Sequence, residues 1–318
     1  LSNSFIEFFG ENAGDQLGYH VGSIGDVDGD GLSDIAMSAP FSDEAGADAG
    51  KIYIFFGQSL SSRGSLSAGD ADRMFIGVAT GDYLGFSFDG GGDLDGDGVS
   101  DLIIGAPRDD SGGSNSGAVY IVAGQSLNSF GTNSTTQLTW NDGVLLGENA
   151  GDQAGYSVSF VYDFYGDGND DFVVGAPFWD LGLGQTSAGK VYIARSDQLA
   201  VGIGNLSDTA ITAIQLTGLQ GGGNLTSGDH AGFSVAGMDD VGTDGRGDVI
   251  IGAPYCDDEG DDSGCAYIFT SDSSLTWGTL PMSSADVRIE GDSDNERLGW
   301  RVAAAGDFDN DQFGDALI

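Results

Sequence analysis

The sequence predicts an all-β fold: a β-propeller of four-stranded antiparallel blades, with a calcium-binding loop between strands one and two of each blade. Three observations support this. An aspartate-rich segment recurs, and its first aspartates are Asp26, Asp93, Asp163, Asp240 and Asp307. Each complete copy leads into a short apolar run that ends in Ala-Pro, which is typical of a buried strand. No segment shows a convincing 3.6-residue apolar period, so almost no helix is expected.

Each unit contains the same predicted strands in the same order. The first strand follows a Gly-aromatic pair, and the second is the apolar run after the aspartates. The third strand is a run such as "GKIYIFFG" (50–57), and the fourth is a short apolar stretch such as "RMFIGV" (73–78). Four strands per unit, repeated radially, are typical of propeller blades.

The whole chain, 1–318, is expected to form a single propeller. The approximate repeats are 13–79, 80–149, 150–226, 227–293 and 294–318. The last repeat is incomplete, and residues 1–12 could complete it by joining residues 4–9 to 298–318. That arrangement leaves the closing blade without its third strand. We therefore expect either an imperfectly closed five-bladed ring or, as we favour, a fragment of a larger ring that exposes a sheet edge.

The aspartate loops have the spacing of a cation site with oxygen ligands. In residues 26–34, aspartates at positions 1, 3, 5 and 9 can converge, and the backbone carbonyl of Leu32 at position 7 can join them. Six to eight oxygens in a flexible loop suit Ca²⁺ better than Mg²⁺. The absence of His and Cys from the loops argues against zinc. An EF-hand is excluded, because an apolar residue such as Met37 stands where that loop needs glutamate.

The five loops are not equivalent, and we expect three strong calcium sites and two that are weaker or empty. The strong candidates are Asp26, Asp28, Asp30, Leu32 and Asp34; Asp93, Asp95, Asp97, Val99 and Asp101; and Asp307, Asp309, Asp311, Phe313 and Asp315. The weaker candidates are Asp163, Asp167, Asn169 and Asp171, and Asp240, Asp244, Arg246 and Asp248. Tyr165 and Gly242 replace the second carboxylate in these two loops.

The repeats resemble the FG-GAP repeat of integrin α-subunit propellers. The resemblance rests on paired motifs at a fixed offset: Gly18-Tyr19 with Ser38-Ala39-Pro40, Gly85-Phe86 with Gly105-Ala106-Pro107, Gly155-Tyr156 with Gly175-Ala176-Pro177, and Gly232-Phe233 with Gly252-Ala253-Pro254. Gly299-Trp300 begins a fifth copy, so the resemblance spans nearly the whole chain. It implies a module for adhesion or surface assembly that meets a protein ligand or a neighbouring subunit.

In integrin-like propellers, the face opposite the aspartate loops meets the ligand and the partner subunit. On this chain that face would display Phe41, Arg108, Phe178, Trp179 and Tyr255 beside the acids Asp43, Glu44, Asp109, Asp110, Asp180, Asp257 and Asp258. A plainer alternative is that the aromatic side chains only cover the rim of the propeller. The recurring aromatic residues Tyr19, Phe86, Tyr156, Phe233 and Trp300 are expected to lie in the core.

The charge and the cysteines indicate the compartment and exclude some partners. The formal net charge of −40 argues against nucleic acid and anionic membranes as partners. The chain contains no run of 18 apolar residues, which argues against direct membrane insertion. Loops of this kind bind calcium with a Kd near 10⁻⁴–10⁻³ M, a range typical of extracellular modules. Cys256 and Cys265 flank a short loop and are expected to form a disulfide, with two free thiols as the alternative.

Two other functions remain as alternatives. A lectin-like propeller could stack Trp179 or Tyr255 on a sugar ring and bind its hydroxyl groups with acidic side chains. An extracellular hydrolase is less expected, because His20 and His230 occupy different repeat positions and no nucleophile motif is present. We therefore expect no enzymatic activity.

Overall fold

The computed structural model describes residues 6–60, 64–127, 134–138, 143–181, 187–199, 202–219, 228–257, 260–272 and 277–318. Within these ranges the chain is all-β, as expected. The helical elements are two single turns, α1 (Gly57–Leu60) and α2 (Gly124–Leu127), and three 3-10 turns, η1 (Ala68–Asp70), η2 (Ser196–Gln198) and η3 (Met282–Ser284). None of the helices in these ranges is long and apolar enough to cross a membrane.

Each unit forms an antiparallel meander in which successive strands pair. The first has β2 (Val21–Gly25), β3 (Asp34–Ala39), β4 (Lys51–Phe55) and β6 (Arg73–Ile76). The second has β7 (Ser87–Gly90), β8 (Leu102–Ala106), β9 (Ala118–Val122) and β11 (Gly143–Leu146). The third has β12 (Ser157–Val161), β13 (Asp171–Ala176), β14 (Lys190–Ala194) and β16 (Ile214–Thr217). The fourth has β17 (Ser234–Met238), β18 (Asp248–Ala253), β19 (Cys265–Phe269) and β21 (Val287–Glu290), and the fifth has β22 (Ala303–Gly306) and β23 (Asp315–Leu317).

Three of these sheets gain a fifth strand that the sequence did not suggest. The added strands run parallel to the outer strand of the preceding unit: β10 (Ser134–Gln137) beside β6, β15 (Ile203–Asn205) beside β11, and β20 (Gly278–Pro281) beside β16. Each comes from the connection between the third and fourth strands of its own unit. Neighbouring units are therefore joined at the outer edge by backbone hydrogen bonds.

The N-terminal strand β1 (Glu7–Phe9) follows the same rule. It pairs in parallel with β5 (Ser65–Ser67), which lies between the third and fourth strands of the first unit. β5 offers β1 the same parallel edge that β10 offers β6. In the described ranges no strand pairing joins residues 7–9 to 298–318, and completion of the last repeat by residues 1–12 stays a prediction.

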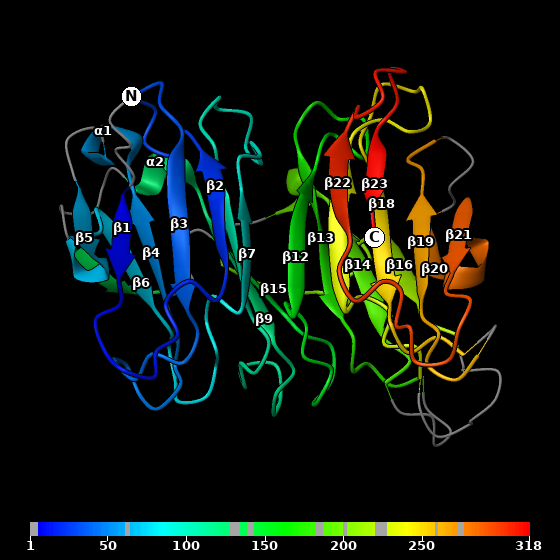
Figure 1. Cartoon of the computed structure of the whole chain (residues 1–318), viewed down its shortest axis with the longest axis horizontal. Helices are drawn as coiled ribbons and strands as arrows, with labels where there is room; N and C mark the ends of the chain where they lie inside the picture. Colours follow the sequence, from blue (N-terminus) through cyan, green and yellow to red (C-terminus); the bar gives the residue numbers. More distant parts are fainter. Residues whose placement is uncertain are drawn as a thin grey trace.

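Hydrophobic side chains between adjacent sheets form the core. One cluster joins Ile52 to Phe88, the next joins Val119 to Phe172, and a third joins Val191 to residues of the fourth unit. The innermost strands β2, β7, β12, β17 and β22 contact one another in sequence. This arrangement fits a β-propeller, although the described sheets do not close into a ring (Figure 1).

Glycines at the start of the third strands allow neighbouring units to approach closely. Gly50 forms a parallel bridge with Leu84, and three later glycines repeat this contact with the following unit. Gly50 has φ +89°, and a Cβ there would lie 2.3 Å from the carbonyl oxygen of Leu84. Any side chain at this position would therefore push two units apart.

Candidate cation loops and opposite aromatic face

The aspartate loops connect the first and second strands of the five units. They lie together at one end of the sheets, the upper end in Figure 1, and the loops after the Ala-Pro segments lie at the other end. Within the described ranges, three groups of carboxylates bring one oxygen each within 4.8 Å of the others: Asp26, Asp28 and Asp34; Asp93, Asp95 and Asp101; Asp307, Asp309 and Asp311. Each group falls in one of the three loops with four aspartates.

Backbone N–H groups fold each of these loops around its first aspartate. In the second loop, the Asp93 carboxylate accepts hydrogen bonds from the N–H groups of Gly96 and Gly98, both at 2.8 Å. Asp97 in turn accepts from the N–H of Val99 at 2.8 Å. Successive bonds of this kind hold several carboxylates close together, where their mutual repulsion favours a bound cation.

The ninth residue of the loop in each complete unit has a second role. Asp101 is buried, and its carboxylate accepts from the N–H of Leu94 at 2.7 Å and of Gly124 at 2.9 Å. Burial, with a smaller contribution from the nearby carboxylates of Asp95 and Asp93, raises the pKa of Asp101 to about 7. The ninth aspartate therefore fastens the loop to the turn after the third strand.

The corresponding aspartates of the other complete units make the same pair of contacts. Asp34 binds the N–H groups of Val27 and Gly57, Asp171 those of Tyr165 and Ser196, and Asp248 those of Val241 and Ser271. The contact is thus present in the loops with three carboxylates as well. It holds the loop to the sheet whether or not that loop binds an ion.

The third and fourth loops differ from the others in ways that disfavour a cation. The hydroxyl of Tyr165 donates to the carbonyl of Ile193 at 2.8 Å, so this hydroxyl binds the third strand of the unit and does not act as a cation ligand. The guanidinium of Arg246 binds the carboxylate of Asp244, with Nε at 2.9 Å. In the fourth loop the chain therefore supplies a positive charge of its own. Neither loop contributes to the carboxylate groups found in the described ranges.

Some predicted ligands remain predictions. The N–H groups of Leu32, Val99 and Phe313 donate to the fifth-position aspartates, and the carbonyls of these three residues remain predicted ligands. Asn169 donates in the same way to Asp167. In the last loop, Asp315 accepts from the N–H of Phe308 at 2.7 Å and lies outside the carboxylate group.

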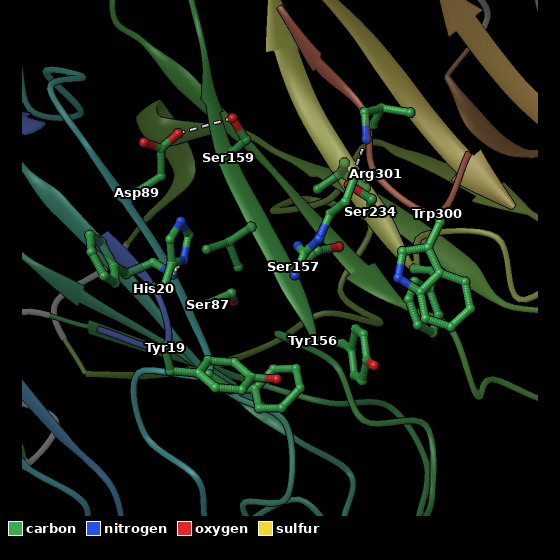
Figure 2. A pocket seen from close by; sticks show the side chains of 16 residues that line it. Tyr19, His20, Ser87, Asp89, Tyr156, Ser157, Ser159, Ser234, Trp300 and Arg301 are labelled. Atoms are coloured by element: carbon green, nitrogen blue, oxygen red, sulfur yellow. Dashed lines mark hydrogen bonds between the residues drawn. The ribbon is translucent and has the colours of Figure 1, made fainter. Parts of the chain in front are cut away.

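At the opposite end, the aromatic rings that precede successive innermost strands form a continuous arc. The ring centroids of Tyr19, Phe86, Tyr156, Phe233 and Trp300 lie 4.7–5.1 Å from their neighbours. We call these five residues the aromatic arc. The expectation that they lie in the core is wrong, because they line a central cavity of about 450 Å³ (Figure 2). The rings converge on the axis without filling it, and Trp300 is 42 % exposed.

The candidate ligand-face residues pack around the aromatic arc. Phe41 contacts Tyr19, Phe178 contacts Tyr156, and Tyr255 contacts Phe233 and Trp300. All three are half-buried, so they cover the rim and still present part of each ring to solvent.

The remaining candidates extend this face outward. The guanidinium of Arg108 lies over the ring of Tyr83, 4.6 Å from its centroid, and Arg108 is exposed. Trp179 packs against the ammonium of Lys190 at 5.0 Å. The acids Asp43, Glu44, Asp109, Asp110, Asp180 and Asp257 occupy the same loops, and Asp258 lies outside the described residues.

Cys256 and Cys265 form a disulfide, as predicted, with a Cα–Cα distance of 5.6 Å. The alternative of two free thiols is therefore wrong. The bond ties the end of the fourth unit's second strand to the start of its third. The guanidinium of Arg288 lies 3.6 Å from both sulfur atoms.

Asp229 is a buried carboxyl whose charge destabilises the fold at neutral pH. It is 2 % exposed, and Oδ1 has no hydrogen-bond partner in the described part of the chain. Burial, with a smaller contribution from the carboxylate of Asp257, raises its pKa to about 7. Because the folded chain then holds this proton more tightly than the unfolded chain, its contribution to stability falls as the pH rises from about 4 to about 7.

Replacing this carboxyl is expected to stabilise the chain at alkaline pH. We expect Asp229→Asn to raise the free energy of unfolding by about 2 kcal/mol at pH 8 and to give no gain at pH 4. Urea unfolding at both pH values measures the difference, with the exposed Asp208→Asn as the matched control. An equal effect of Asp229→Asn at the two pH values would contradict this account.

Comparison with known proteins identifies the repeat. The FG-GAP repeat model matches residues 18–55, 84–122 and 154–193, which contain the first three strands of the first three units. The chain carries FG-GAP repeats. The fourth FG-GAP-like unit has the same strand order in the structure, although it lies outside the matched residues.

Relatives of the FG-GAP chain include two integrin α subunits and an enzyme. It is 29 % identical to integrin alpha-PS2 of Drosophila melanogaster over 74 % of this chain, and 26 % identical to integrin alpha-6 of Gallus gallus over 84 %. It is also 26 % identical to phosphatidylinositol-glycan-specific phospholipase D of Dictyostelium discoideum over 69 %. The chain spans 15 %, 22 % and 23 % of the length of these relatives, respectively.

Proposed function

We propose that the chain is an extracellular recognition module whose FG-GAP units form one propeller, 1–318, stabilised by calcium. The observation that carries the proposal is the division between the two ends of the sheets. One end holds three convergent carboxylate groups, and the other presents an aromatic surface with an exposed arginine. Aromatic residues and arginine on loops over a rigid scaffold are typical of protein-recognition surfaces.

The calcium assignment follows from the ligand chemistry. The three loops offer carboxylate and carbonyl oxygens and contain no nitrogen or sulfur ligand, which favours a hard cation. We assign ions to the loops 26–34, 93–101 and 307–315. The loops 163–171 and 240–248 are proposed to remain without calcium. Tyr165 supplies no carboxylate and its hydroxyl is bound to Ile193, and Arg246 pairs its own positive charge with Asp244.

The integrin α relatives support adhesion through protein contact. The disulfide agrees with an oxidising, extracellular environment. The phospholipase D relative shows that similar repeats occur in an enzyme, but we propose no catalytic residue for this chain. A glycan ligand is the main alternative, and the experiment below distinguishes it.

We expect the chain to bind a protein from an array of extracellular proteins in millimolar calcium. Phe178→Ala and Arg108→Ala should weaken that binding about tenfold or more, because they remove an aromatic anchor and an exposed guanidinium. Tyr162→Ala is the matched control, since Tyr162 is 64 % exposed at the aspartate-loop end. Binding only to a glycan array, or equal losses in the control, would overturn the proposal of a protein-recognition face.

A further inference from the structure

The central cavity has the size and lining of a small-ligand site. Its volume of about 450 Å³ lies within the range of known ligand pockets. The aromatic arc forms one wall, and the residues that follow each ring, at or just before the start of the five innermost strands, complete the lining. Flat rings on adjacent strands suit a planar or ring-shaped ligand.

The residue after each aromatic ring forms a second layer: His20, Ser87, Ser157, Ser234 and Arg301. Three are serines that join neighbouring units. The hydroxyls of Ser87 and Ser157 donate to the carbonyls of Gly155 and Gly232, both at 2.8 Å, and Ser234 accepts from the N–H of Val302. His20 and Arg301 depart from this pattern, and in Figure 2 they lie on opposite sides of the cavity.

Arg301 is exposed, and its charge has no partner among the described residues. Within the described ranges it makes no ion pair, hydrogen bond or ring contact. Each other described lysine or arginine makes at least one: Lys51, Arg73, Arg108, Lys190, Arg195, Arg246, Arg288 and Arg297. An arginine with none of these three kinds of contact is unexpected in a chain with 50 acidic residues.

The other polar groups leave the cavity with hydrogen-bond donors. The carboxylate of Asp89 is already used, because it accepts from Ser159 Oγ, the N–H of Phe160 and its neighbour Gly90, each at 2.9 Å. Burial lowers the pKa of His20, and the charge of Arg301 lowers it further, so the imidazole is neutral at pH 7. Its Nδ1 accepts from the N–H of Phe88 at 3.3 Å, which places the proton on Nε2.

We propose that this cavity binds a small organic carboxylate with a ring-shaped body. The guanidinium of Arg301 pairs with the carboxylate, the Nε2–H of His20 supplies a second donor, and the aromatic arc packs on the ring. The aromatic arc borders the protein-recognition face, but Phe178 and Arg108, which test that face, do not line the cavity. Its ligand is a free small molecule, so the site can fail or succeed independently of the proposed function.

Three related probes test the charge preference of the cavity: phenylacetate, the neutral phenylacetamide and the cationic benzylammonium. Titrations followed by the indole N–H signal of Trp300, assigned with Trp300→Phe, are made in calcium and about 0.15 M salt to screen the acidic surface. We expect phenylacetate to shift this signal and to bind at least tenfold more tightly than phenylacetamide.

Variants of two arginines decide whether Arg301 is responsible. Arg301→Gln should reduce phenylacetate binding about tenfold and leave phenylacetamide binding unchanged, whereas Arg108→Gln, on the same face but outside the cavity, should change neither. Circular dichroism and melting confirm that both variants fold. If Arg301→Gln does not fold, the preference of the unmodified chain for phenylacetate over phenylacetamide still tests the proposal. Equal binding of phenylacetate and phenylacetamide, tighter binding of benzylammonium than of phenylacetate, or no shift with any probe would overturn the proposal.

Discussion

Removing calcium is expected to lower the free energy of unfolding of the chain by about 4 kcal/mol and its Tm by about 10 °C. A site with a Kd of about 10⁻⁴ M contributes about 1.4 kcal/mol at millimolar calcium, and three loops carry convergent carboxylates. Chelation also leaves those carboxylates to repel one another. Melting curves at pH 7.5, with calcium and after chelation, measure the change.

Single substitutions can divide this effect among the loops. Asp28→Asn and Asp95→Asn each remove one carboxylate from a convergent group, so each should abolish about a third of the calcium-dependent increase in Tm. Asp244→Asn is the matched control in the fourth loop, where Arg246 already pairs with the carboxylate. The same melting curve with and without calcium would contradict the structural role of the ion.

The second large effect is expected from the buried ninth aspartate. Asp171→Ala should lower the free energy of unfolding by about 3 kcal/mol, because it leaves the N–H groups of Tyr165 and Ser196 without their acceptor. The loss should be the same with and without calcium, because we propose no ion in this loop. Urea unfolding in both conditions measures it.

Asp167→Ala provides the control for this prediction. Asp167 lies in the same loop but is exposed, and its carboxylate accepts from the N–H of Asn169. Asp167→Ala should lower the free energy of unfolding by less than half as much as Asp171→Ala does. An Asp171→Ala loss that appears only in calcium would show that this aspartate acts as an ion ligand instead of a fastener.

Features encoded within a single unit could be predicted from the sequence. The apolar runs before Ala-Pro gave β3, β8, β13 and β18, because each is buried between two neighbouring strands and proline ends its pairing. The position of the aspartate loops followed from the strands on either side. The disulfide followed from two cysteines on the same short connection.

Features that depend on contacts between units could not be predicted in this way. The parallel strand β10 has the sequence Ser-Thr-Thr-Gln, which lacks an apolar pattern and is fixed by its hydrogen bonds to β6. The second contact of Asp101 lies 23 residues further along the chain. The aromatic arc and the cavity exist only because five strands meet at one axis, so a recurring aromatic residue gave no sign of whether it faced the core or the cavity.

The most direct test of the calcium sites is native mass spectrometry of the chain in calcium, before and after chelation. We predict three bound calcium ions, all lost on chelation, with one fewer ion in Asp95→Asn and the same number in Asp244→Asn. Five ions would show that Tyr165 and Arg246 do not prevent binding in the third and fourth loops. No bound ion would contradict the account, because the convergent aspartates would then have no cation to neutralise them.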